Sequence, residues 1–187
     1  MNTTHAKSIA LCALLMLLMA VTRSHHFDSL THLPDASLAA FLLAGFYLPF
    51  IAFPILLVVA GLADYFAFNY ASVSDWCFSP AYWFLIPTYA VLFYAGRFFA
   101  KRYQFTWYSL IEFAVIAASA ISLAFLISNT SFYLLAGYFE KMSAWEYASS
   151  VAKYFMPYQI SAFMYLSIAA VLHIVVAKRT HGKQLAG

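Results

Sequence analysis

Long apolar stretches are the feature that most constrains how this chain can fold. Of its 187 residues, 65% are hydrophobic and only 9% are charged. Five apolar segments carry this character: Ser8–Thr22, Ala36–Phe68, Ala81–Phe99, Phe105–Ile127 and Tyr158–Ala177. Inside a bilayer the backbone must satisfy its own hydrogen bonds, and apolar runs of about 20 residues do so as helices. The sequence therefore predicts an all-α integral membrane protein and excludes an ordinary soluble domain.

The second segment is too long for one helix across the bilayer. At ~1.5 Å per residue it would reach about 50 Å, against a hydrocarbon core of about 30 Å. Pro49 and Pro54 lie in its middle, and proline breaks or kinks a helix because it lacks the backbone N–H. We therefore expect two short helices joined tightly near Leu48–Ile51, and a six-transmembrane-helix bundle in all.

The six helices are expected to form one transmembrane domain over residues 1–187. Their expected bounds are residues 8–22, 36–49, 51–68, 80–99, 105–127 and 157–177, with longer loops at residues 23–35, 69–79 and 128–156. Apolar residues recur at roughly helical spacing within the last loop: Phe139, Met142, Trp145, Ala148, Val151 and Phe155. This pattern predicts an amphipathic helix at the membrane surface, either a lid over a pocket or a simple connector.

Basic residues predict the orientation of the bundle. Seven of the ten Lys and Arg residues would face the cytoplasm: Lys7, Arg97, Lys101, Arg102, Lys178, Arg179 and Lys183. This excess follows the positive-inside rule and puts both termini in the cytoplasm. A five-helix arrangement with an outside N-terminus gives the same split, because Lys7 and Arg23 trade places. Both arrangements put the loops 69–79 and 129–156 outside.

The net charge of +3 is modest and lies mostly beside the apolar segments. No basic stripe lies on a polar element, so nucleic acid is not an expected partner. The sequence contains no phosphate-binding loop, H-E-x-x-H motif or nucleophile elbow, which excludes a self-contained ATPase.

Cys77 is the residue best placed to carry chemistry. It lies in an outer loop, two residues before Ser79-Pro80, and this pair is typical of a helix start with Ser as N-cap and Pro at the first helical position. The positive end of the helix dipole favours thiolate over thiol, and thiolate is a strong ligand for transition metals. The alternative is a buried loop cysteine packed against Trp76. Cys12 lies inside an apolar run, where a free cysteine behaves as a small hydrophobe.

Polar residues near the outer loops offer further candidates. His25, His26 and His32 lie in the first outer loop and could complete a zinc or copper site with Cys77, or act only as loop hydrogen-bonding groups. Asp64 lies within an apolar helix, where a carboxylate is a functional candidate by default, although it could also reach the interface or cap a neighbouring helix.

Other polar residues have plainer explanations beside the functional ones. Tyr82, in the first turn after Pro80, could stack on a planar ligand or belong to an aromatic belt. Asp35 is best explained as the N-cap of the helix that follows it. Glu112 and His173 are better explained by hydrogen bonds between helices than by a proton path.

Four segments of the chain together resemble a known family. They are Thr22-Arg23-Ser24-His25-His26-Phe27, Leu33-Pro34-Asp35-Ala36-Ser37-Leu38-Ala39, Ala44-Gly45-Phe46-Tyr47-Leu48 and Trp76-Cys77-Phe78-Ser79-Pro80-Ala81-Tyr82. These segments are similar to the BtuM family, the cobalamin-specific substrate-binding (S) components of energy-coupling-factor-type transporters. The similarity runs from the first span to about Arg97, and beyond that only the hydrophobic profile matches.

The resemblance implies a six-helix bundle in the bacterial inner membrane, with a cobalamin pocket open to the outside. It implies Cys77 as axial cobalt ligand, because the corrin ring supplies the four equatorial ligands. It also implies reductive decyanation of cyanocobalamin as a side activity, with Cys77 as the catalytic residue. His25, Asp64 and Tyr82 are implied as pocket residues.

The resemblance also implies a partner and leaves two other functions open. Ala6 and Ala10 match an A-x-x-x-A pattern that in other S components docks the membrane subunit of an energy-coupling-factor module, which also carries the ATPases. A membrane metal-binding protein or metalloenzyme using Cys77 and the histidine loop is one alternative. A structural membrane subunit whose outer loops bind a partner is the other.

Overall fold

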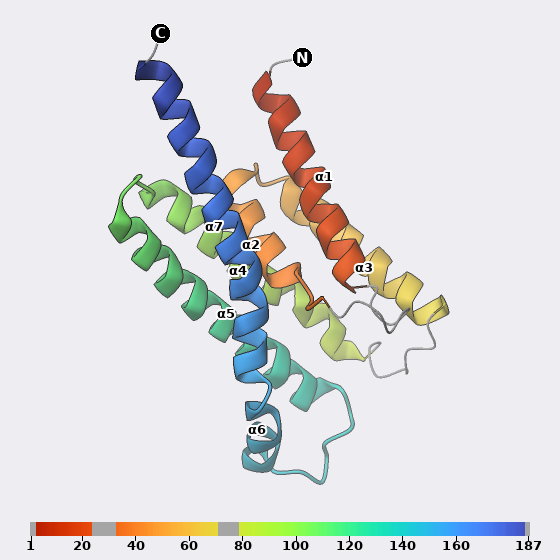
Figure 1. Ribbon diagram of the computed structural model, residues 1–187. Coiled ribbons are helices and arrows are strands. Elements are labelled where there is room, and N and C mark those ends of the chain that lie inside the picture. The colour runs from red at the N-terminus through yellow and green to blue at the C-terminus, as the bar shows by residue number, and fades with distance from the viewer. Residues whose placement is uncertain (1–2, 24–32, 71–78, 186–187) are drawn as a thin grey trace.

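The computed structural model describes residues 3–23, 33–70 and 79–185, and over these ranges the chain is helical with no strand (Figure 1). The α-helices are α1 (Thr3–Arg23), α2 (Ser37–Tyr47), α3 (Ala52–Tyr70), α4 (Leu85–Arg102), α5 (Trp107–Leu135), α6 (Ala144–Ala152) and α7 (Phe155–Leu185). A short 3₁₀ helix, η3 (Pro80–Phe84), leads directly into α4. The all-α prediction is therefore confirmed for the part of the chain that is described.

Within the described residues, four helical stretches are long and apolar enough to cross a membrane. They are His5–Arg23, Pro80–Arg102, Trp107–Leu135 and Phe155–Lys178, whereas Ser37–Tyr47 and Ala52–Ala67 are shorter apolar helices. Large apolar side chains such as Val115, Ile160 and Leu172 are exposed on the long helices. An outer surface of this kind suits contact with lipid and not with water.

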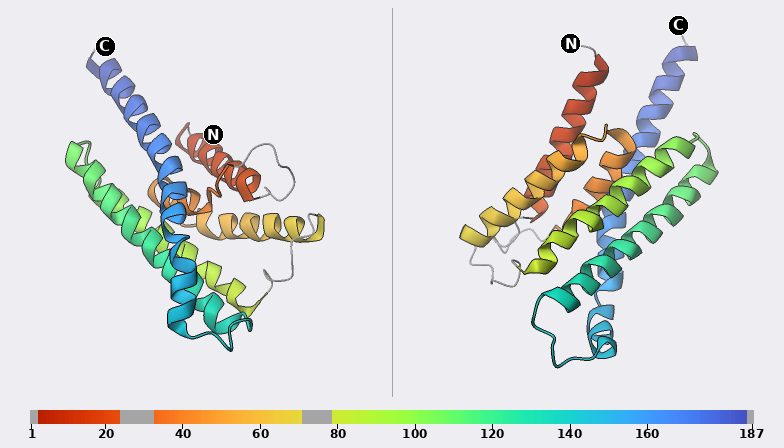
Figure 2. Two further views of the ribbon diagram at one scale, coloured as in Figure 1. Left: turned by 60° about the horizontal axis from the view of Figure 1, so that its bottom comes forward. Right: turned by 180° about the vertical axis from the view of Figure 1, so that it is seen from behind.

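Six of the helices alternate in direction. Figures 1 and 2 show that α1, α3 and α5 run away from the end of the molecule where α1 begins, and that α2, α4 and α7 return toward it. The beginning of α1 and the end of α7 therefore lie at the same end. The predicted break in the second apolar segment is confirmed, because α2 ends at Tyr47 and α3 begins at Ala52.

Helix α2 lies at the centre of the bundle. All residues from Ser37 to Gly45 are buried, and α2 packs against α1, α3, α4 and α7. With 11 residues it is only about 17 Å long at ~1.5 Å per residue, shorter than the predicted 36–49. A helix this short leaves non-helical backbone at both of its ends, and such backbone is tolerated at membrane depth only where protein surrounds it.

Side chains from neighbouring elements satisfy the backbone at both ends of α2. Three hydrogen bonds do so: the Ala36 N–H to Thr22 Oγ1 (3.0 Å), the Tyr165 hydroxyl to the Pro34 carbonyl (2.6 Å) and Arg97 Nη1 to the Leu48 carbonyl (3.1 Å). The prediction that Asp35 is the N-cap of α2 is wrong by one residue, although Asp35 Oδ1 accepts the N–H of Ser37 at 2.9 Å. The helix itself is counted from Ser37, with Ala36 in the N-cap position.

Two glycines bring the backbones of α2 and α4 into direct contact. A Cβ atom added at Gly45 would lie 1.9 Å from the carbonyl oxygen of Phe93, and one added at Gly96 would lie 2.0 Å from that of Leu42. No side chain can move aside to relieve contacts of this kind, because the atoms met belong to the backbone. The two helices can therefore pack this closely only with glycine at both positions.

Helix α5 corrects the predicted outer loop 128–156. The helix continues to Leu135, beyond the predicted end at residue 127. Its polar residues there bond within the helix: Asn129 Nδ2 donates to the Phe125 carbonyl and Ser131 Oγ to the Ser128 carbonyl. Gly137 follows with a positive φ of 77°, the left-handed conformation that typically ends a helix and that glycine adopts at no steric cost.

A helix within this loop is confirmed as α6, which covers residues 144–152 of the pattern predicted from Phe139 to Phe155. It begins with a capping box, in which Ser143 Oγ accepts the N–H of Glu146 and the Glu146 carboxylate accepts the N–H of Ser143. These hydrogen bonds to the ionised form lower the pKa of Glu146 below its usual 4.5. Together the two residues satisfy donors that the first turn of a helix otherwise leaves unpaired.

Removal of the Ser143 hydroxyl is expected to loosen α6 without unfolding the bundle. In Ser143→Ala, amide hydrogen exchange over residues 144–152 should accelerate roughly five-fold, the usual effect of a lost N-cap. Ser149→Ala is the matched control, since its hydroxyl bonds the Trp145 carbonyl within the same helix and caps nothing. Equal exchange rates in the two variants would show that the capping box does not stabilise α6.

Candidate functional site

The described candidates lie at the end of the bundle opposite the beginning of α1. Asp64 lies near the end of α3, and Tyr82 lies in η3, which begins the return toward the other end (Figure 1). Cys77 and His25 lie outside the described residues, as do His26 and His32. Of the four predicted pocket residues, the structure therefore places Asp64 and Tyr82.

Asp64 and Tyr82 are in direct contact. The Tyr82 hydroxyl donates to Asp64 Oδ2 at 2.9 Å. The sequence places Tyr82 there because Ser79 is extended and Pro80 takes the first helical position, as predicted. The first turn is a 3₁₀ helix and not an α-helix, however, and the Ser79 side chain makes no capping hydrogen bond.

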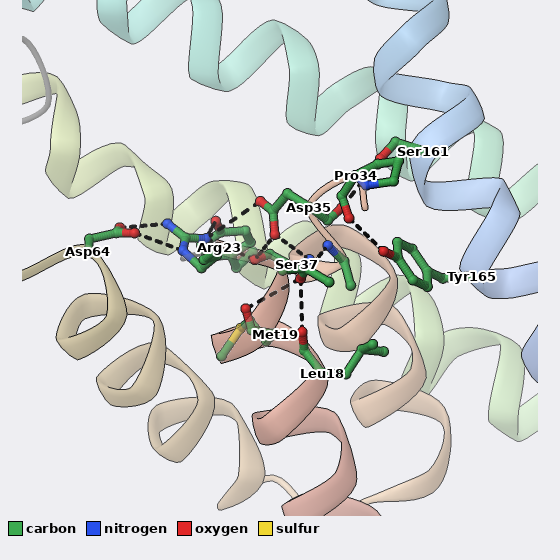
Figure 3. A network of polar contacts seen from close by, with 12 residues as sticks. Leu18, Met19, Arg23, Pro34, Asp35, Ser37, Asp64, Ser161 and Tyr165 are labelled. Carbon is green, nitrogen blue, oxygen red and sulfur yellow. Dashed lines mark hydrogen bonds and ion pairs between the residues drawn. The ribbon is translucent and has the colours of Figure 1, made fainter. Parts of the chain in front are cut away.

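Arg23 at the end of α1 makes a two-pronged ion pair with Asp64. Its Nε donates to Oδ1 at 2.8 Å and its Nη2 to Oδ2 at 2.6 Å (Figure 3). The Arg23 side chain is only 10% exposed. Asp64 therefore neither reaches the interface alone nor caps a neighbouring helix, because its carboxylate neutralises a buried guanidinium.

The remaining donors of Arg23 join two more helices to this pair. Its Nη1 donates to Ser37 Oγ at 2.9 Å and also to the Tyr89 hydroxyl. Tyr89 is buried and its ring stacks on Phe41, with the ring centroids 4.2 Å apart. We call Arg23, Ser37, Asp64, Tyr82 and Tyr89 the Arg23 cluster. It links the end of α1 to α2, α3, η3 and α4.

Asp35 lies at the edge of the Arg23 cluster and is the most open acidic group there. Its Oδ2 is 3.8 Å from Arg23 Nη1, and its side chain is 50% exposed. Its Oδ1 accepts from both the N–H and the hydroxyl of Ser37. Two carboxylates thus face one guanidinium, which leaves a net negative charge. Asp35 can accept a hydrogen bond from a ligand more readily than Asp64, whose two oxygens are both engaged.

The sequence prediction missed Arg23 as the partner of Asp64. The pattern of basic residues gives Arg23 no partner, yet Arg23 ends an apolar helix just as Asp64 lies within one. Two opposite charges in apolar segments are best accommodated by pairing with each other. Both charges are visible in the sequence, but the sequence alone does not show which basic residue pairs with Asp64.

A cavity of about 300 Å³ lies at the opposite end of the bundle. It is lined by α2, α4, α5, α7 and the residues that connect α4 to α5, and among its lining residues are Phe46, Phe113 and His173. Neither Asp64 nor Tyr82 lines it. This cavity is therefore separate from the predicted corrinoid pocket.

No group of three or more His, Cys, Asp or Glu side chains suited to a metal ion occurs among the described residues. The residues of the predicted zinc or copper site, Cys77 with His25, His26 and His32, lie outside the described ranges. The zinc or copper alternative thus remains a hypothesis.

Over the described residues the chain is all-helical, and several of its helices are long and apolar enough to span a bilayer. No protein-family model matches the chain, and no curated protein matches its sequence.

Proposed function

We propose that this protein binds cobalamin from outside the bacterial inner membrane and takes part in its uptake, with Cys77 as the axial ligand of cobalt. The observation that carries the proposal is the segment Trp76–Tyr82, in which a lone cysteine precedes the Ser79-Pro80 helix start. A substrate that brings four equatorial ligands to its metal needs only one ligand from the protein. A single cysteine in this segment suits such a substrate.

The chemistry of Cys77 supports this role. The helix that begins at Pro80 presents its positive dipole end toward the preceding residues, which favours the thiolate form of a nearby cysteine. A soft thiolate then replaces a weaker axial ligand on cobalt. We propose that the same sulfur also assists reductive decyanation of cyanocobalamin: the thiolate takes the place of cyanide, which leaves as the anion, and an external reductant supplies the electron that cobalt takes up.

The Arg23 cluster supports the placing of the substrate at this end of the bundle. Its ion pair holds the ends of α1 and α3 and the start of η3 in fixed relation. Asp35 offers a half-exposed carboxylate beside it, and the amide groups at the rim of a corrinoid are suitable donors to such an acceptor. In this proposal Asp64 and Tyr82 position the pocket more than they contact the substrate, and His25 completes it.

The proposed assembly is a bundle of six transmembrane helices with both termini in the cytoplasm. The alternating directions of α1, α2, α3, α4, α5 and α7 are consistent with an even number of crossings. The energy-coupling-factor module, with its membrane subunit and ATPases, is the proposed partner. Ala6 and Ala10 are the proposed docking residues on α1.

Replacement of Cys77 tests the proposal. Residues that only hydrogen-bond a metal ligand typically contribute about 10–100-fold to the affinity for the metal. Loss of the ligand itself in Cys77→Ala should therefore weaken hydroxocobalamin binding by on the order of 100-fold. Titration calorimetry of the detergent-purified protein measures this. Cys12→Ala is the matched control, because Cys12 is a half-buried free cysteine of α1. Equal affinities in the two variants would contradict cobalt ligation by Cys77.

A further inference from the structure

The cavity at the opposite end of the bundle has no role in the function proposed above. It lies where α5 begins and where α7 approaches its C-terminal end. The two helices contact each other through Phe125 and Tyr158 near the Arg23 end, and they diverge toward the cavity end (Figures 1 and 2). The cavity occupies the space that opens between them.

Several polar side chains that line the cavity, those of Tyr47, Tyr103, Ser109 and His173, are hydrogen-bonded. The Tyr47 hydroxyl lies 2.7 Å from His173 Nδ1, and the Tyr103 hydroxyl lies 2.8 Å from Nε2. A neutral imidazole donates one of these bonds and accepts the other, and burial raises the pKa of Tyr103, which keeps its proton. Ser109 Oγ accepts the N–H of Gln104. The interhelical role predicted for His173 is thus confirmed.

With its polar groups engaged in this way, the cavity offers an apolar wall. Phe46, Phe99, Phe113 and Leu166 supply much of its remaining lining. A cavity of about 300 Å³ is far larger than the space that one water molecule needs, and it has room for a stretch of hydrocarbon chain. Its size and lining suit a hydrocarbon chain.

The rim of the cavity has the composition of a membrane interface. The side chains of Phe105 and Trp107 line the cavity yet are exposed, Trp107 by 73%, and exposed aromatic residues gather where lipid headgroups begin. Lys178 also lines the cavity and is exposed. The nearest carboxylate along α5, Glu112, is paired with Arg102 at 2.6 Å, so it does not neutralise Lys178.

We propose that this cavity binds one acyl chain of an anionic phospholipid from the surrounding bilayer, with the lipid phosphate held at Lys178. The chain enters between α5 and α7 and fills the aromatic cavity, while the headgroup stays at the interface. The bound lipid supports the divergent ends of α5, which packs on α4, and of α7, which packs on α2.

Native mass spectrometry of the intact protein, released from detergent after incubation with phosphatidylglycerol or phosphatidylcholine of the same chains, tests the proposal. The wild type should retain one phosphatidylglycerol and prefer it roughly five-fold, the effect of one basic residue near an anionic headgroup. Ala170→Leu narrows the cavity and should lose the retained lipid. Ser167→Leu, on an exposed position of the same helix that does not line the cavity, is the control and should keep it.

Lys178→Gln should retain both lipids equally, and because Lys178 is exposed its replacement leaves folding intact. Absence of a retained lipid in the wild type, or equal retention by Ala170→Leu and Ser167→Leu, would overturn the chain-binding site. Should Ala170→Leu fail to fold, the lysine variant decides. An unchanged preference for phosphatidylglycerol in Lys178→Gln would overturn the assignment of the headgroup.

Discussion

Replacing Asp64 by alanine is expected to destabilise the bundle by about 3 kcal/mol, because the buried Arg23 guanidinium loses its hydrogen-bonded carboxylate and keeps only the half-exposed Asp35, 3.8 Å away, as a compensating charge. Arg23 would keep Ser37 and Tyr89 as acceptors but would lose both of its bonds to a carboxylate. Its side chain is almost fully buried, so water cannot replace them. The free energy of unfolding in detergent, with circular dichroism as the probe of helix content, measures this loss.

The pair between Arg102 and Glu112 provides the control. It has the same 2.6 Å separation, but the Arg102 side chain is 57% exposed. Glu112→Ala should therefore cost less than about 1 kcal/mol. The double variant Arg23→Met/Asp64→Leu should recover part of the stability that Asp64→Ala loses, because no buried charge is left unpaired and Asp35 is half exposed. Equal losses in Asp64→Ala and Glu112→Ala would contradict the structural role of the Arg23 cluster.

Gly96→Ala is expected to destabilise the bundle by about 3 kcal/mol, at the upper end of the usual cost of overpacking. The added methyl group would lie 2.0 Å from the Leu42 carbonyl oxygen and 2.9 Å from the Phe46 nitrogen. Both atoms belong to the backbone of α2, so α2 and α4 must separate. The thermal unfolding midpoint in detergent and the yield of monodisperse protein measure this effect.

Gly61→Ala is the matched control for the α2–α4 contact. Its added Cβ atom would meet only the Tyr82 hydroxyl, at an ordinary 3.9 Å. Since alanine favours a helix over glycine, this variant should be neutral or more stable by up to about 1 kcal/mol. If Gly96→Ala were as stable as Gly61→Ala, the close packing of the two helices would be wrong.

Much of the fold could be predicted from the sequence because apolar length alone defines most of the helices. The break near Leu48–Ile51, which the prolines mark, and the helix α6 could also be predicted, because each follows from a local sequence pattern. The end of α5 could not be predicted, because Asn129 and Ser131 are residue types common in loops, whereas here their side chains bond to carbonyl groups of their own helix. Gly137 was the available sign that the helix ends later.

The candidate site could be predicted only in part. Asp64 was recognisable as a carboxylate within an apolar helix, but its pairing depends on how α1 and α3 cross, which no local pattern encodes. The same holds for Gly45 and Gly96: each is an ordinary glycine in the sequence, and only the packing of α2 on α4 reveals why neither can carry a side chain.

The absorption spectrum of the protein purified with added cobalamin tests the central claim most directly. Wild-type protein should carry a corrinoid whose absorption bands are shifted from those of free cobalamin, because a thiolate replaces the axial ligand of cobalt. The Cys77→Ala variant should show the spectrum of free cobalamin or carry no corrinoid. A wild-type protein that binds no cobalamin, or a Cys77→Ala spectrum identical to that of the wild type, would contradict cobalt ligation by Cys77.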